Sequence, residues 1–145
     1  MYRIIYTSHN LEDSDQIRSM LPADEFEFVL RPKRIDQDED LLIATCEGAD
    51  AVICDYQYFS PRVLDALPKL KLIQFMSVGY NYVDFDYATA KGITIANCPT
   101  YCTGEVADHA VALVLAINRR LFEYSRAIRE RGEWNATAPK NMFSM

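Results

Sequence analysis

The sequence predicts an α/β domain built on a five-stranded parallel sheet. Short apolar runs alternate, over residues 3–96, with segments in which apolar side chains recur at helical spacing. This alternation is typical of parallel strands whose connecting helices cover both faces of the sheet. The chain has 145 residues, the usual length of one domain, and 50% of them are hydrophobic, which is enough to bury a core.

Each expected element has a local signal in the sequence. The five strands are expected over residues 3–6, 25–30, 51–54, 71–76 and 93–96. Four residues are suited to begin the helices between them: Asn10, Asp36 in a capping box with Glu39, Ser60 before Pro61, and Asp84. Three residues are expected to end such helices: Pro22, Gly48 and Gly92.

The simplest arrangement of these elements is a doubly wound sheet of flavodoxin type, with strand order 2-1-3-4-5. Ligands of such sheets bind beyond the carboxyl ends of the strands. Three segments follow strand ends here: Asp55-Tyr56, Ser77-Val78-Gly79 and Asn97-Cys98-Pro99. We expect these segments to converge on one edge of the sheet.

The turn Ser77-Val78-Gly79 is the leading candidate for a binding site. Glycine can adopt a positive φ and lets the backbone approach a ligand, so successive N–H groups can form an anion-binding concavity. A carboxylate would fit these donors, and Tyr56 and Tyr101 are near enough in the topology to add hydroxyl groups. The alternative is that Gly79 only makes a sharp turn between strand and loop.

Beyond Pro99 the pattern changes to one long helix. Thr103 is suited to cap it, and apolar residues then recur at steps of four and three as far as Arg131. About 27 residues at ~1.5 Å each span roughly 40 Å, more than the width of a domain of this size. We expect a sheet domain over 1–103, a long interdomain or dimerisation helix over 104–131, and a tail or linker over 132–145.

The charge pattern argues against binding to nucleic acid. The net charge is −6, with 8 basic and 14 acidic residues over 1–75 and 7 of each over 76–145. No face-wide excess of Lys or Arg is therefore available to displace phosphate counterions. The longest apolar run, Ala110 to Ile117, is too short for a membrane span. No signal peptide is recognisable, so we expect a cytoplasmic protein with four free cysteines.

The sequence shows no convincing catalytic or metal site. A hydride-transfer centre needs a positioned acid or base, and His9 and His109 are the only histidines. Glu105, Asp108 and His109 share one helical face and could bind a metal, but the helix dipole alone favours carboxylates there. The five glycines include no G-x-G-x-x-G loop. We expect neither a catalytic residue nor a metal ligand in this chain.

Two segments carry a specific family resemblance, LKLIQFMSVGYNYVD and AKGITIANCPTYCTGEVADHAVALVLAINRRL. They closely resemble the NAD-dependent D-isomer-specific 2-hydroxyacid dehydrogenases, in particular the branch near phosphoglycerate dehydrogenases and carboxy-terminal-binding-type corepressors. The resemblance covers residues 50–131 and is weaker over 1–49. In that family, a flavodoxin-like substrate domain precedes a Rossmann domain that binds NAD.

This resemblance implies a site and a partner. The carboxylate of a small 2-hydroxy or 2-oxo acid would bind the backbone amides of residues 77–79. Tyr56 and Tyr101 would lie at the substrate cleft, and Val106 beside the nicotinamide. The helix over 105–131 would join two copies in a homodimer.

The resemblance also implies what is missing. The glycine loop and the catalytic arginine, acid and histidine of the family's Rossmann domain do not occur in this chain. We therefore expect a truncated substrate domain, inactive by itself, that does not bind NAD tightly.

Two other classes of function remain open. A signalling receiver domain shares the fold, and Asp55, Ser77 and Cys98-Pro99 match part of its pattern. However, Ser8-His9 replaces its acidic pair and its lysine is absent, so Mg²⁺ could not be held in the usual way. The second alternative is a non-catalytic dimerisation or corepressor-like module that uses the long helix.

Overall fold

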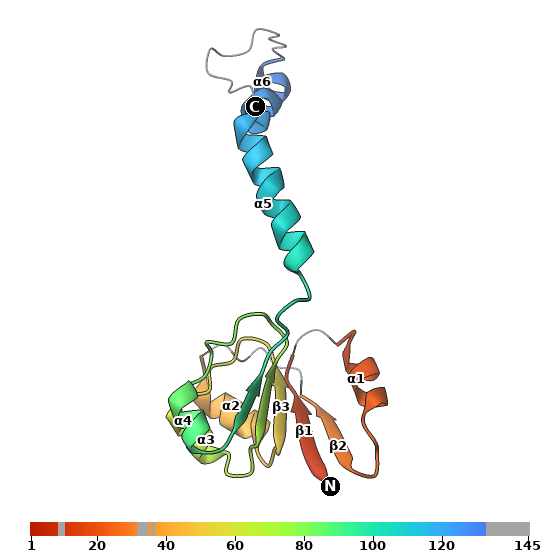
Figure 1. Ribbon diagram of the computed structural model, residues 1–145, viewed down its shortest axis with the longest axis vertical. Coiled ribbons are helices and arrows are strands. Elements are labelled where there is room, and N and C mark those ends of the chain that lie inside the picture. The colour runs from red at the N-terminus through yellow and green to blue at the C-terminus, as the bar shows by residue number, and fades with distance from the viewer. Residues whose placement is uncertain (9–10, 32–34, 36, 133–145) are drawn as a thin grey trace. The chain divides into compact units, whose positions relative to one another are not determined.

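The computed structural model describes residues 1–8, 11–31, 35 and 37–132 (Figure 1). The chain divides into two compact units, of which the first is Met1–Tyr101 and the second begins at Cys102.

The first unit is a five-stranded parallel sheet with helices between the strands. Its elements are, in order, β1 (Tyr2–Tyr6), α1 (Ser14–Met20), β2 (Phe26–Leu30), α2 (Glu39–Cys46), β3 (Ala51–Cys54), α3 (Pro61–Ala66), β4 (Leu72–Phe75), α4 (Phe85–Ala90) and β5 (Thr94–Ala96). The strand order is β2-β1-β3-β4-β5, and every neighbouring pair is parallel. The predicted doubly wound sheet of order 2-1-3-4-5 is confirmed.

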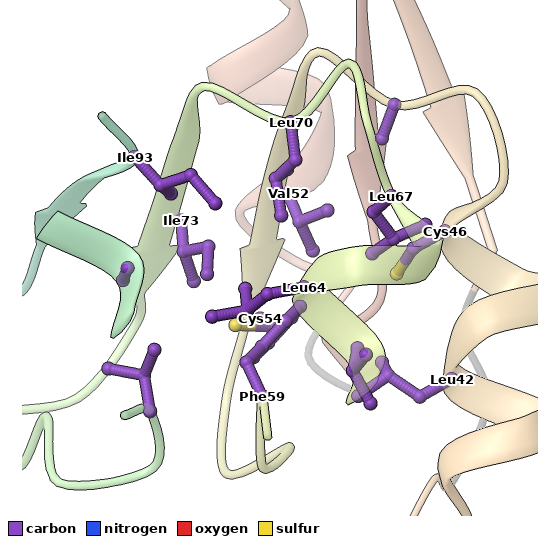
Figure 2. Close-up of a cluster of buried hydrophobic side chains, with 14 of the residues drawn as sticks. Leu42, Cys46, Val52, Cys54, Phe59, Leu64, Leu67, Leu70, Ile73 and Ile93 are labelled. Carbon is purple, nitrogen blue, oxygen red and sulfur yellow. The ribbon is translucent and has the colours of Figure 1, made fainter. Parts of the chain in front are cut away.

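The hydrophobic core lies between the sheet and the group of helices α2, α3 and α4. Alternate residues of the central strands point into it because successive strand side chains face opposite sides; Val52, Cys54 and Ile73 are fully buried. Figure 2 shows these strand side chains directed toward Leu64 of α3 and Leu42 of α2. This packing holds the strands in register, so the loops that follow β3, β4 and β5 begin at the same edge of the sheet.

Side-chain caps begin three of the helices. Ser60 Oγ accepts a hydrogen bond from the Val63 N–H, and an Asp84 carboxylate oxygen accepts one from the Tyr87 N–H, both as predicted. Helix α2 differs, because Asp38 is its cap and accepts from the Leu41 N–H at 2.9 Å. The predicted cap at Asp36 falls outside the described residues, as does the one at Asn10.

Glycines with positive φ follow two of these helices, as predicted. Gly48 has φ +76° after α2, and Gly92 has φ +72° after α4. The left-handed backbone conformation ends a helix and strains any residue with a Cβ. The sharp return of the chain into β3 and β5 therefore depends on glycine at these positions.

The second unit contains two helices, α5 (Thr103–Asn118) and α6 (Leu121–Arg131), where the sequence predicts one. The single helix over 104–131 is wrong because Arg120 adopts a left-handed conformation, with φ 52° and ψ 38°. The Arg120 N–H bonds to the Ile117 carbonyl, closing α5, while its own carbonyl accepts from the Tyr124 N–H and opens α6. Apolar periodicity continues across this break, so the pattern could not reveal it.

The start of α5 also differs from the prediction. Thr103, expected as the cap, is the first helical residue, and Cys102 takes the cap position without a side-chain cap bond. No residue of α5 or α6 is buried, although Val111, Val114 and Ile117 are large and apolar. Within the described residues, no helix has the length and apolar character needed to cross a membrane.

The cysteines provide a test of the core. All four are unpaired; Cys46 and Cys54 are buried, whereas Cys98 and Cys102 are half-buried. Burial raises the pKa of Cys46 to about 12 and that of Cys54 well above its usual value, so their thiolates are scarce at neutral pH.

We expect a thiol reagent at pH 8 to modify Cys98 and Cys102 rapidly in the native protein, and the buried pair only after unfolding. Counting modified thiols with and without denaturant measures this directly. A variant with serine at both half-buried positions serves as the control and should show no rapid phase. Four equal rates in the native protein would contradict the packing described above.

Candidate carboxylate-binding site

The candidate site is built on the turn that follows β4. Ser77 is 5% exposed, and its hydroxyl donates a 2.7 Å hydrogen bond to the Gly79 carbonyl, which closes the turn. In the part of the chain that the structure describes, the N–H groups of Ser77, Val78 and Gly79 have no hydrogen-bond acceptor. Three successive unpaired donors are suited to a carboxylate, which can accept several hydrogen bonds at once.

The segment after β5 holds the carbonyl side of this turn. The Cys98 N–H donates to the Ser77 carbonyl at 3.0 Å, and the Asn97 side-chain amide donates to the Val78 carbonyl at 2.8 Å. Because the carbonyls are engaged in this way, the turn is fixed while its donors stay available. The predicted convergence of these two strand ends is confirmed.

The loop after β3 is joined through backbone hydrogen bonds to residues 82–84, in the loop that begins with this turn. The Phe59 N–H donates to the Tyr82 carbonyl at 2.8 Å, and the Asp84 N–H donates to the Phe59 carbonyl, forming an isolated parallel bridge between Phe59 and Val83. The Tyr56 ring packs edge-on against the Tyr82 ring, with centroids 5.5 Å apart. Tyr56 therefore lies beside the loop that begins with the candidate turn.

Gly79 does not use the positive φ that glycine permits. Its φ is not positive, unlike those of Gly48 and Gly92. A Cβ on Gly79 would stand 3.6 Å from Asn81 Oδ1 and 3.9 Å from Tyr82 Cε2, which are ordinary contacts. The fold thus tolerates a Cβ here, and backbone strain does not require glycine at this position.

Tyr101 and Val106 fall in different units. Tyr101 is the last residue of the first unit and Val106 belongs to α5; their side chains are 64% and 62% exposed. Within the first unit, Tyr82 packs against Tyr56 and also lies near Gly79, so Tyr56 is linked to the turn through Tyr82. The places of Tyr101 at the cleft and of Val106 beside a nicotinamide stay predictions.

A pocket of about 390 Å³ lies beside Tyr56 and Tyr82, which belong to the loops that follow β3 and β4. Its lining includes three tyrosines, two carboxylates, an amide and a leucine: Tyr56, Tyr58, Tyr82, Asp38, Glu39, Gln37 and Leu42. Only Tyr56 among them was a sequence-based candidate. The alternation Tyr56-Gln57-Tyr58 was a possible signal, because Gln57 is buried at 3% exposure while both neighbouring rings are exposed.

Glu39 stays ionised at the edge of this pocket. A hydrogen bond from Ser60, and then one from Arg62, lower its pKa below the usual value. The Arg62 guanidinium lies 2.9 Å from Glu39 Oε2 and also pairs with Asp40. Its positive charge is therefore already matched by one carboxylate of the pocket lining, Glu39, and by Asp40.

Metal-ligand chemistry has little support from the described residues, among which no group of three or more His, Cys, Asp or Glu side chains could hold an ion. Glu105, Asp108 and His109 are all exposed along α5.

Comparison with known proteins shows the family of this chain. The model of the D-isomer specific 2-hydroxyacid dehydrogenase catalytic domain matches residues 5–143. The chain belongs to the D-isomer specific 2-hydroxyacid dehydrogenases. The family predicted from LKLIQFMSVGYNYVD and the segment that follows it is thereby confirmed.

Individual members of the 2-hydroxyacid dehydrogenases match part of their length. A glyoxylate reductase of Thermofilum pendens is 36% identical over 95 residues, which is 65% of this chain and 28% of that protein. A D-3-phosphoglycerate dehydrogenase of Mycobacterium tuberculosis is 38% identical over 94 residues, or 64% of this chain and 18% of that protein. The chain therefore spans under a third of these curated relatives.

Two solved structures illustrate that the fold is shared with known proteins. D-lactate dehydrogenase from Aquifex aeolicus, solved with NAD and lactic acid, aligns with a TM-score of 0.71 at 23% identity, covering 98% of this chain and 40% of that one. The protein TT0316 from Thermus thermophilus aligns with a TM-score of 0.73 at 25% identity, covering 100% and 45%.

The residues of this 2-hydroxyacid dehydrogenase chain do not form a dinucleotide cradle. Its five glycines stand at positions 48, 79, 92, 104 and 132, too far apart for a glycine-rich phosphate loop. The three N–H groups of the candidate turn could bind an anion. However, they do not lie at the N-terminus of a helix, which is where the pyrophosphate of a dinucleotide binds. The sequence therefore contains a candidate anion-binding turn and no glycine-rich dinucleotide loop.

Proposed function

We propose that this chain is the substrate-binding part of an oxidoreductase that acts on the CH–OH group of 2-hydroxy acids, and on 2-oxo acids in the reverse direction, with NAD(H). The observation that carries the proposal is the turn at residues 77–79, where three unpaired N–H groups face no internal acceptor. A hydrogen bond to a charged group contributes about 1.5–3 kcal/mol, so two or three of them can fix a carboxylate.

The residues around the turn would orient the acid rather than transform it. Ser77, tied to Gly79, and the bonds from Asn97 and Cys98 preorganise the donors, so little order is lost on binding. Tyr56 and Tyr101 would contact the rest of the substrate, and Val106 would lie beside the nicotinamide. NAD supplies the hydride chemistry when it is bound to the family's nucleotide domain.

We expect the carboxylate site to be visible by NMR in the chain as it is. Adding glyoxylate should shift the amide signals of Ser77, Val78 and Gly79, because their N–H groups gain a charged acceptor. Glycolaldehyde, which has the same carbon skeleton without a carboxylate, serves as the control and should leave these signals in place. Unchanged amide signals at saturating glyoxylate would refute the proposal.

A separate measurement tests the assignment of the cofactor to another domain. Calorimetric titration with NADH should give no heat of tight binding, because the chain has no glycine-rich loop. Tight nucleotide binding by the chain alone would show that its cofactor site had been overlooked.

The same proposal gives the second unit a role in forming a homodimer. Helix α5 carries apolar side chains around its circumference, with Val111, Val114 and Ile117 exposed. A helix that is apolar on all sides is normally buried against other helices. A second copy of this chain would cover it, which also suits a non-catalytic dimerisation or corepressor-like role.

We expect sedimentation to give a dimer for the wild-type chain and a monomer for Val114→Asp, because a buried unpaired carboxylate is costly. Ser125→Asp, at an exposed polar position of α6, is the matched control and should remain dimeric. A wild-type monomer at all concentrations would exclude α5 as a self-association surface.

A further inference from the structure

The pocket beside the candidate turn shares a wall with it. Tyr82 Cε2 lies 3.9 Å from the point where a Cβ on Gly79 would stand, and the Tyr82 ring packs against Tyr56. Tyr56 and Tyr82 both line the pocket of about 390 Å³. A ligand whose carboxylate is bound at residues 77–79 can therefore extend along these rings into the pocket.

The lining of this pocket is mainly aromatic. Tyr58 joins Tyr56 and Tyr82, and the buried Leu42 adds an aliphatic surface. Tyr56 and Tyr58 are 62% and 46% exposed, so their rings have surface left to cover a ligand. Aromatic groups pack well against such rings in edge-to-face or offset geometry, and the volume is within the usual range of small-molecule sites.

The charges around the pocket are negative. Glu39 and Asp38 belong to the lining, and no Lys or Arg occurs among its described residues. Arg62, the cation that contacts Glu39, is paired with Asp40 as well. A phosphate or second carboxylate on the ligand would therefore approach Asp38 and Glu39, and none of the described lining residues could supply it with a positive charge.

We propose that this tyrosine pocket, lined by residues 37–39, 42, 56, 58 and 82, receives the side chain of the 2-hydroxy acid and selects an uncharged aromatic group over an anionic one. The inference rests on the proposed function, because it takes the carboxylate of the same acid to be at residues 77–79. It assigns the substrate class to 2-hydroxy and 2-oxo acids with an aromatic side chain.

The test compares three 2-oxo acids by NMR on the chain as it is. Phenylpyruvate has an aromatic side chain, 3-phosphooxypyruvate an anionic one, and glyoxylate none. We expect all three to shift the amides of the turn, only phenylpyruvate to shift the ring signals of Tyr56, Tyr58 and Tyr82, and the phosphorylated acid to bind roughly tenfold more weakly than phenylpyruvate.

Variants separate the contributions of the rings and the charges. Tyr58→Ala should weaken phenylpyruvate binding about fivefold while leaving glyoxylate binding unchanged. Tyr2→Ala, an exposed tyrosine at the opposite end of the sheet, is the matched control and should alter neither. The double variant Asp38→Asn, Glu39→Gln removes both negative charges from the pocket lining and should therefore strengthen binding of the phosphorylated acid severalfold. Asparagine preserves the cap of α2, so the helix should remain in place.

The outcomes distinguish the two proposals. If the turn amides respond to all three acids but the tyrosine rings do not respond to phenylpyruvate, the pocket assignment is wrong and the proposed function stands. Equal or tighter binding of 3-phosphooxypyruvate by the wild-type chain also overturns the selectivity. If no acid shifts the turn amides, the carboxylate site fails, and the pocket assignment fails with it.

Discussion

Replacing Phe59 by alanine is expected to lower the free energy of unfolding by about 3–5 kcal/mol, the usual cost of deleting a buried phenyl ring. Phe59 is fully buried and packs edge-on against Phe75, with ring centroids 6.4 Å apart. Small domains are stable by only about 5–15 kcal/mol, so this one change removes a large part of the total. Denaturant unfolding followed by circular dichroism measures it.

Phe85→Ala is the matched control for this prediction. The Phe85 ring is exposed and packs edge-on against Tyr80, so we expect a loss of about 1 kcal/mol, the contribution of one aromatic pair. Equal losses for the two variants would contradict the placement of Phe59 in the core.

Replacing Gly79 by alanine is expected to abolish carboxylate binding without destabilising the fold. The backbone of Gly79 is outside the positive-φ region, and the added Cβ meets only ordinary contacts at 3.6 and 3.9 Å. The free energy of unfolding should therefore change by no more than about 0.5 kcal/mol. Affinity for glyoxylate should fall at least roughly tenfold, because the methyl group occupies space between the turn donors and Tyr82.

Gly92→Ala should show the reverse pattern. Gly92 has φ +72°, where a Cβ costs about 1–2 kcal/mol of stability. It lies between α4 and the start of β5, whereas the candidate turn adjoins the far end of β5, so carboxylate binding should be unchanged. Unfolding and NMR titration of both variants give the comparison. If Gly79→Ala instead loses stability and retains binding, the turn is structural and the proposed site is wrong.

The strand order was predictable because it depends on signals that are local in the sequence. Apolar residues such as Val52 and Cys54 mark the buried strands, and caps such as Ser60 and Asp84 mark where helices begin. Helices between parallel strands then leave few arrangements of the sheet. The same reasoning placed the cap of α2 at Asp36, whereas the structure places it at Asp38, two residues later.

The break between α5 and α6 was not predictable in this way. Arg120 takes a left-handed conformation without a glycine or proline to mark it, and the apolar steps of three and four continue through the break. Apolar periodicity reports which face of a helix is buried, not whether its backbone is continuous. Two backbone hydrogen bonds decide that point: the Arg120 N–H donates to the Ile117 carbonyl, and the Tyr124 N–H donates to the Arg120 carbonyl.

The sequence alone determined the parallel sheet, the position of the turn at residues 77–79, and the family resemblance, since each rests on residues close together in the chain. Only the tertiary structure decided that Gly79 has an ordinary backbone conformation and that its neighbour Tyr82 forms a pocket with Tyr58 and Asp38. The physical reason is distance along the chain. The bridge from Phe59 to Val83 and the packing of Tyr56 on Tyr82 join loops separated by a whole helix and strand.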